Sequence, residues 1–104
     1  MPEELVEGWT ETIRQTLKDD GVAVNGTGLT LGLELHDREG GAVETGGGKT
    51  AWSTQVSGIA GFTPAAEDLV ATRGPYKARW VVTSGSTVVY YPNGEADVWK
   101  VRAK

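Results

Sequence analysis

Hydrophobic and polar residues alternate strictly between residues 29 and 35, where every odd position is leucine and the even positions are Thr, Gly and Glu. A helix would scatter these leucines around its circumference, whereas a strand places all of them on one face. Residues 76–82 repeat the pattern with Tyr, Ala, Trp and Val at alternate positions. Both segments are therefore predicted to be half-buried strands.

Weaker signals predict four further strands, at residues 10–17, 50–56, 87–91 and 96–103. The segments between them are rich in Gly, Asp, Asn and Ser, which favour turns. Trp52 and Val56 are expected to share an inward face. One helix of about two turns is expected near residues 63–70, with Thr63 as its N-cap and Pro64 at its first position. The pattern predicts an all-β fold, an antiparallel β-sandwich or barrel with this one short connecting helix.

The inward positions of the predicted strands define the expected core. Six side chains are expected to be buried together: Leu31, Leu33, Tyr76, Trp80, Trp99 and Val101. Residues 10–104 would form this single sandwich domain, preceded by an N-terminal arm of residues 1–9. The apolar residues of the arm, Leu5, Val6 and Trp9, are predicted to contact a neighbouring chain, and a frayed terminus is the alternative.

Composition narrows the classes of function. The chain has 104 residues, enough for one domain, and a net charge of −4 without a dense basic run, so nucleic acid is not an expected partner. It contains no cysteine and one histidine, which argues against thiol chemistry and the usual metal sites. The acidic N-terminus lacks an apolar signal segment, and no later stretch reaches the ~18 apolar residues of a membrane span. We therefore expect neither a membrane partner nor an export signal.

Charge is divided unevenly along the chain. Residues 1–72 carry four basic and twelve acidic side chains, net −8, whereas residues 73–104 carry six basic and two acidic, net +4. One interpretation is neutralisation within the sandwich, where distant parts of the chain become neighbours. The other is complementary patches on adjacent subunits.

Two motifs suggest chemistry on first inspection. Residues 46–50 read G-G-G-K-T, like the end of a phosphate-binding loop, but the required earlier glycine is Val43 and a strand rather than a helix is predicted next. A hairpin loop is the better interpretation. His36 lies beside Asp37 and resembles a general base, but no nucleophile can be assigned to it. We therefore expect no enzymatic activity, while a role as an enzyme inhibitor stays open.

The C-terminal part of the chain carries a distinctive succession of motifs. Residues 74–83 read G-P-Y-K-A-R-W-V-V-T, and residues 88–95 read V-V-Y-Y-P-N-G-E. A glycine, a Tyr-x-Ala-aromatic strand, a turn and a strand ending in aromatic-Pro-Asn follow in this order. The succession resembles the small immunoglobulin-like domains of tailed-bacteriophage virion proteins, and it is similar to the N-terminal domain of phage baseplate upper proteins. The resemblance covers roughly residues 10–103.

This resemblance implies an immunoglobulin-like sandwich in which Tyr76 bonds back to the connection at residues 63–73, an arrangement known as a tyrosine corner. It also implies a non-enzymatic virion component, assembled in the host cytoplasm as multiple copies together with other virion proteins. No cofactor, metal or small-molecule substrate is expected, and the neck or head–tail connector, tail, baseplate and capsid surface all stay open as locations. The alternative is a carbohydrate-binding or host-adhesion module, which requires aromatic side chains exposed on one face.

Overall fold

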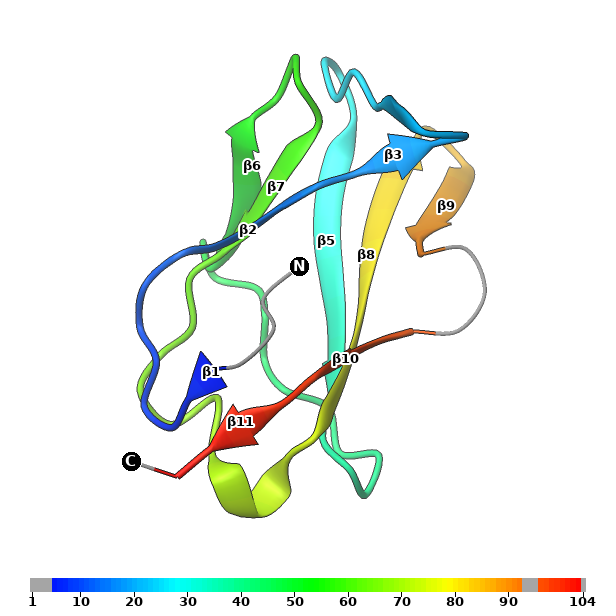
Figure 1. The fold of residues 1–104 in the computed structure, drawn as a ribbon. Coiled ribbons are helices and arrows are strands. Elements are labelled where there is room, and N and C mark those ends of the chain that lie inside the picture. The colour runs from blue at the N-terminus through cyan, green and yellow to red at the C-terminus, as the bar shows by residue number, and fades with distance from the viewer. Residues whose placement is uncertain (1–4, 93–95, 104) are drawn as a thin grey trace.

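The computed structural model describes residues 5–92 and 96–103, and this part of the chain forms two antiparallel sheets joined as a β-sandwich (Figure 1). The larger sheet contains β5 (Thr30–His36), β8 (Tyr76–Ser84), β9 (Thr87–Tyr91) and β10 (Asp97–Trp99). The smaller sheet contains β2 (Ile13–Thr16), β6 (Thr50–Thr54) and β7 (Ile59–Phe62). Two short ladders complete it: β1 (Leu5–Val6) with β11 (Val101–Arg102), and β3 (Lys18–Asp19) with β4 (Val22–Ala23). The all-β prediction is confirmed.

Strand β8 organises the larger sheet. The whole length of β5 pairs with one edge of β8, and Leu33 lies opposite Trp80. β9 and β10 share the other edge, β9 along the C-terminal half of β8 and β10 along its N-terminal half. In the smaller sheet β7 lies between β2 and β6. The Asn93-Gly94 turn expected between β9 and β10 lies outside the described residues.

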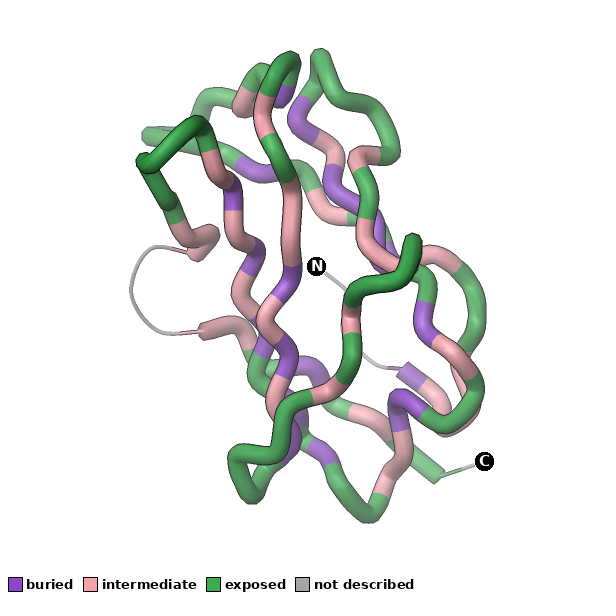
Figure 2. The backbone as a smooth tube through the Cα atoms, turned by 180° about the vertical axis from the view of Figure 1, so that it is seen from behind, coloured by how far each residue is buried: buried purple, intermediate pink, exposed green. Residues whose placement is uncertain are grey.

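The core lies between the two sheets and is dominated by aromatic side chains. The ring of Trp99 lies 6.4 Å from that of Trp80 and 6.3 Å from that of Phe62, measured between centroids. Gln15 of β2 reaches across from the smaller sheet, and its Oε1 accepts a hydrogen bond of 3.1 Å from Trp80 Nε1. Figure 2 shows burial alternating along the strands, as a two-sided sheet requires. This packing takes the place that a disulfide holds in many small sandwiches.

Four residues of the expected core are buried in it: Leu33, Tyr76, Trp80 and Trp99. Leu31 and Val101 are half-buried and pack against its margin. Val56, which was expected to face inward with Trp52, is 68% exposed, because β6 ends at Thr54 before reaching it. Trp52 is half-buried.

The helix expected near residues 63–70 does not form. The segment makes a turn instead, in which the Asp68 carboxylate accepts the Ala65 N–H at 2.8 Å and the Asp68 N–H donates to the Ala65 carbonyl at 3.0 Å. Thr63 does not act as an N-cap, because its N–H donates to the Lys49 carbonyl and its hydroxyl bonds to that of Thr12. The only described helix is one 3₁₀ turn, η1 (Ala71–Arg73), just after this segment.

The N-terminal arm is also corrected by the structure. Leu5 is 1% exposed and belongs to the core, and its N–H donates to the Lys100 carbonyl at 2.9 Å. β1 runs parallel to β11, beside it in Figure 1, with Leu5 opposite Val101. Val6 and Trp9 are half-buried, and Trp9 packs against the core. An arm of residues 1–9 separate from the sandwich is therefore wrong for its described part, because burying Leu5 and pairing the β11 edge both stabilise the closed form.

Candidate functional site

The carboxylate of Asp37, the candidate partner of His36, is fully committed to structural contacts. Its Oδ1 accepts the N–H groups of Glu39 and Gly41 at 2.9 and 2.8 Å. Its Oδ2 forms an ion pair of 2.7 Å with Arg73, which lies just before β8. The bond from Arg73 and those from the backbone lower the pKa of Asp37, and the same pair raises the pKa of Arg73. The carboxylate therefore ties the turn after β5 to η1 and does not orient a base.

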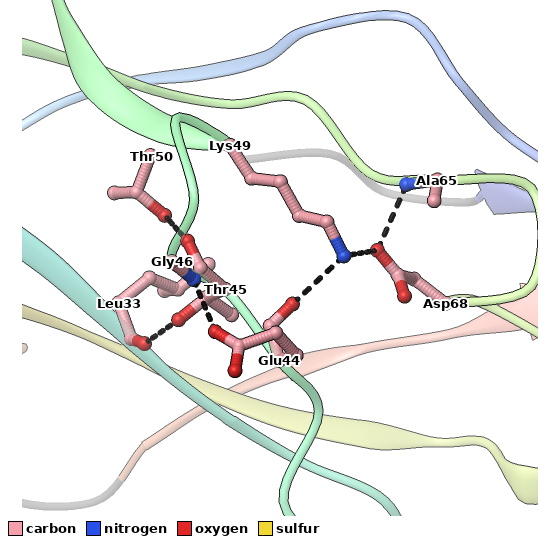
Figure 3. A network of polar contacts seen from close by, with 8 residues as sticks. All are labelled: Leu33, Glu44, Thr45, Gly46, Lys49, Thr50, Ala65 and Asp68. Atoms are coloured by element: carbon pink, nitrogen blue, oxygen red, sulfur yellow. Dashed lines mark hydrogen bonds and ion pairs between the residues drawn. The ribbon is translucent and has the colours of Figure 1, made fainter.

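The G-G-G-K-T motif is likewise structural, as Figure 3 shows. Lys49 Nζ donates to Asp68 Oδ2 at 2.9 Å and to the Glu44 carbonyl at 3.2 Å, so its charge is balanced within the molecule. The Thr50 hydroxyl donates to the Thr45 carbonyl at 2.7 Å, and Thr50 begins strand β6. The motif thus forms a loop that leads into a strand, but it is not the expected hairpin, because β5 before it and β6 after it lie in different sheets. The loop secures the turn around Asp68.

Within residues 5–92 and 96–103, no three His, Asp or Glu side chains gather as a metal site would need. None of the described helices has the length and hydrophobicity to cross a membrane.

The outer face of the larger sheet is a surface to which four strands contribute side chains. Its side chains come from alternate positions of the four strands: Glu34, His36, Lys77, Arg79, Val81, Val88, Tyr90 and Val98. Arg79 lies at its centre, 3.3 Å from Glu34 Oε1 and with its guanidinium 4.2 Å above the Tyr90 ring. These contacts hold Arg79 in a defined position beside an aromatic ring.

This outer face is divided into a charged end and an apolar end. At the charged end, Glu34, His36, Lys77 and Arg79 line an open hollow of about 460 Å³. At the apolar end, Val81 of β8 lies opposite Tyr90 of β9. Val88 is two residues before Tyr90 on β9 and therefore lies on the same face. Val88 is 48% exposed. Val81 and Tyr90 beside it are half-buried. Apolar side chains that form a contiguous patch commonly mark a surface for another protein.

The two long edges of the larger sheet differ in how they are protected. Along the β5 edge two strand carbonyls have partners, since Leu35 accepts the Val43 N–H and Leu33 the Thr45 hydroxyl. Leu29, just before the strand, accepts the Trp52 indole N–H. At the opposite edge lies β9, with sequence T-V-V-Y-Y and no charged residue. Among the described residues β9 pairs with β8 alone, and Figure 1 places it at the margin of the molecule. An edge strand of this kind is open to backbone pairing.

The predicted interface residues do not contribute to this surface, because Leu5 is in the core and the half-buried Val6 and Trp9 lie at β1 and after it. The sequence analysis predicted β9 as a strand but did not identify its open edge as a candidate site. Its signal was present as an uncharged, β-branched and aromatic run of five residues. What the run could not reveal is which strand edges the rest of the chain covers.

Tyr76 occupies the position expected of it. Its hydroxyl accepts the Val70 N–H at 3.0 Å and donates to the Val70 carbonyl at 3.5 Å, which joins the start of β8 to the preceding connection. The tyrosine corner is therefore present. Comparisons with protein-family models, curated proteins and solved structures return no match for this chain.

Proposed function

We propose that the protein is a non-enzymatic structural component of a tailed-phage virion, assembling on the particle in multiple copies with other virion proteins. The observation that carries the proposal is the β8–β9 hairpin. The residues that resemble phage immunoglobulin-like domains build this hairpin, which begins at the Tyr76 corner and ends in an uncharged edge strand. The same element thus carries the resemblance and a surface suited to assembly.

The order of strands also supports an immunoglobulin-like arrangement. β2, β7 and β6 form one sheet, β5, β8 and the β9–β10 segment form the other, and β1 joins β11 at the side. In immunoglobulin domains strands B, E and D likewise lie in one sheet, and strands C, F and G in the other. Here β2, β7 and β6 take the places of B, E and D, while β5, β8 and the β9–β10 segment take those of C, F and G. A role in assembly requires such a rigid framework, with its contacts supplied by edges and loops.

The carbohydrate-binding alternative has no observation in its favour. Trp80 and Trp99 are fully buried, and the Trp52 indole N–H is taken by the Leu29 carbonyl at 3.0 Å. The aromatic side chains on which that alternative depended therefore pack inside the fold or against it. Tyr90, on the outer face, has the Arg79 guanidinium above its ring.

The location of the protein in a particle tests the proposal. Particles of the phage that encodes the chain would be purified by density gradient and their proteins quantified by mass spectrometry. We expect this chain to remain with the particles through repeated purification, at a fixed ratio to the other virion proteins. Recovery of the chain only in the particle-free fraction would overturn the proposal.

A further inference from the structure

Strand β9 directs part of its backbone hydrogen-bonding capacity away from the molecule. Ser84 and Thr87 are opposite each other across a two-residue turn, so they form a hydrogen-bonded pair, and this type of pair recurs at every second position. Val89 and Tyr91 therefore bond to β8. Val88 and Tyr90 direct their N–H and C=O groups to the open edge, where no partner lies among the described residues.

The inner side of β9 is partly covered, so a partner must approach along the edge. Tyr91 packs against the core, and this burial together with the nearby Asp19 carboxylate raises its pKa. β9 itself carries no charge, so pairing along it brings no like charges onto the strand. An approaching extended backbone would meet exposed valines, with Val88 at 48% and Val89 at 38% exposure.

We propose that β9 pairs antiparallel with β9 of a second copy of this chain, in a register that places Val89 opposite Val89 of the other copy. In this register Val88 of each copy exchanges backbone hydrogen bonds with Tyr90 of the other, so the outward groups of both residues are satisfied. A shift of two residues would bring either Ser86 of the turn or Pro92, which has no N–H, into the ladder. Self-pairing is thus favoured in a single register.

The side chains fit the same register. Val88 of one copy lies opposite Tyr90 of the other on the outer face, a β-branched and aromatic pair of the kind that stabilises antiparallel ladders. The result is one continuous sheet across two copies related by a two-fold axis. That this dimer occurs in a virion rests on the proposed function. Within that function, the inference names a second copy of the chain as one partner.

Val88→Lys and its matched control Val98→Lys test the pairing. Both valines lie on the outer face and both are 48% exposed, but Val98 is on β10. Sedimentation equilibrium over a wide concentration range should show a dimer for the wild type and for Val98→Lys. Val88→Lys should weaken dimerisation about tenfold or more, because each copy would place a charge beside the seam. A monomeric wild type, or equal dimerisation of the two variants, would overturn the proposal.

Val88→Pro and hydrogen exchange supply readouts that do not depend on charge. Val88→Pro removes an outward N–H without removing a bond to β8, so it should abolish dimerisation while circular dichroism retains the wild-type spectrum. In the wild type, the Val88 and Tyr90 amides should become protected from exchange as concentration rises. Unchanged exchange at both amides would contradict the register.

A dimer in solution that is missing from particles would overturn the proposed function alone, and a monomeric virion protein would overturn this inference alone.

Discussion

Trp80 and Trp99 are equally buried, yet their indole N–H groups have different surroundings. Trp80 Nε1 donates a hydrogen bond to Gln15 Oε1 of the opposite sheet. Gln15 Nε2 in turn donates one to Asp97 Oδ2 at 3.4 Å. Trp99 Nε1 is buried without an acceptor among the described residues. A buried donor without an acceptor is costly, whereas a bond between the sheets fixes how they face each other. The two tryptophans therefore contribute differently to stability.

Phenylalanine substitutions should reveal this difference. Trp80→Phe and Trp99→Phe remove the same atoms, but only Trp80→Phe leaves the Gln15 carbonyl without its donor. We expect Trp80→Phe to lower the free energy of unfolding by about 1–3 kcal/mol more than Trp99→Phe does. Urea denaturation of both variants measures this, and a larger loss for Trp99→Phe would contradict it.

The Asp37–Arg73 pair predicts how stability depends on pH. The pKa of Asp37 in the folded chain is lower than its ordinary value of 3.8, so its contribution is complete above that value and is lost as pH falls through the folded pKa. Asp37→Asn should lower the melting temperature at pH 7, and its difference from the wild type should shrink below about pH 4. Thermal melts from pH 7 to pH 2 test this. A difference that stays constant over that range would show that the charge is not involved.

Among the elements, β1 departs most from the expectation. Its two residues pair with β11 and place Leu5 in the core, whereas the acidic N-terminal segment suggested an arm for another chain. A hydrophobic residue in a polar segment marks a contact but does not say with which chain. The structure answers this for Leu5, whose contact is with its own core.

Leu5→Ala measures what β1 contributes. Emptying a buried leucine site typically costs about 2–5 kcal/mol, and Leu5 is 1% exposed. Val6→Ala is the control, because Val6 is half-buried on the same strand and should cost less. Chemical denaturation gives both values. An unchanged stability for Leu5→Ala would favour the arm interpretation again.

The sequence predicted the strands whose side chains alternate. β5, β8 and β9 follow from strict alternation or from β-branched and aromatic runs, and the bounds of β9 are those expected. β7, with sequence I-A-G-F, was not predicted, because Ala60, Gly61 and Phe62 are all buried and no polar residue marks an outer face. Gly61 suits its position in β7, because a Cβ there would crowd the Thr12 methyl group at 3.2 Å and the Ala51 carbonyl at 3.3 Å.

The candidate surface was less predictable, because it depends on contacts between distant segments. β5 and β9 are both rich in residues that favour strands, and both lie at an edge of the larger sheet. Only the folded chain shows that Val43 and Thr45 bond to the β5 edge while the β9 edge stays open among the described residues. Pairing between non-consecutive strands thus decides where a partner can bind.

At the scale of the whole molecule, the uneven charge along the sequence is partly balanced within one chain. Arg73 pairs with Asp37 and Arg79 with Glu34, so basic residues of the C-terminal part meet acidic residues of the N-terminal part. The Arg79–Glu34 pair is partly exposed and adds little to stability. These pairs fit neutralisation inside the sandwich, and β9, which forms the proposed seam, has no charged residue of its own.

The parallel pairing of β1 with β11 orders the events of folding. Leu5 leaves the ribosome well before Lys100, yet its N–H donates to the Lys100 carbonyl. Contacts over such long separations form late and slow the folding of β-rich domains. A nascent chain therefore carries β1 unpaired, and Leu5 unburied, until residues 101 and 102 have been synthesised and the sandwich closes.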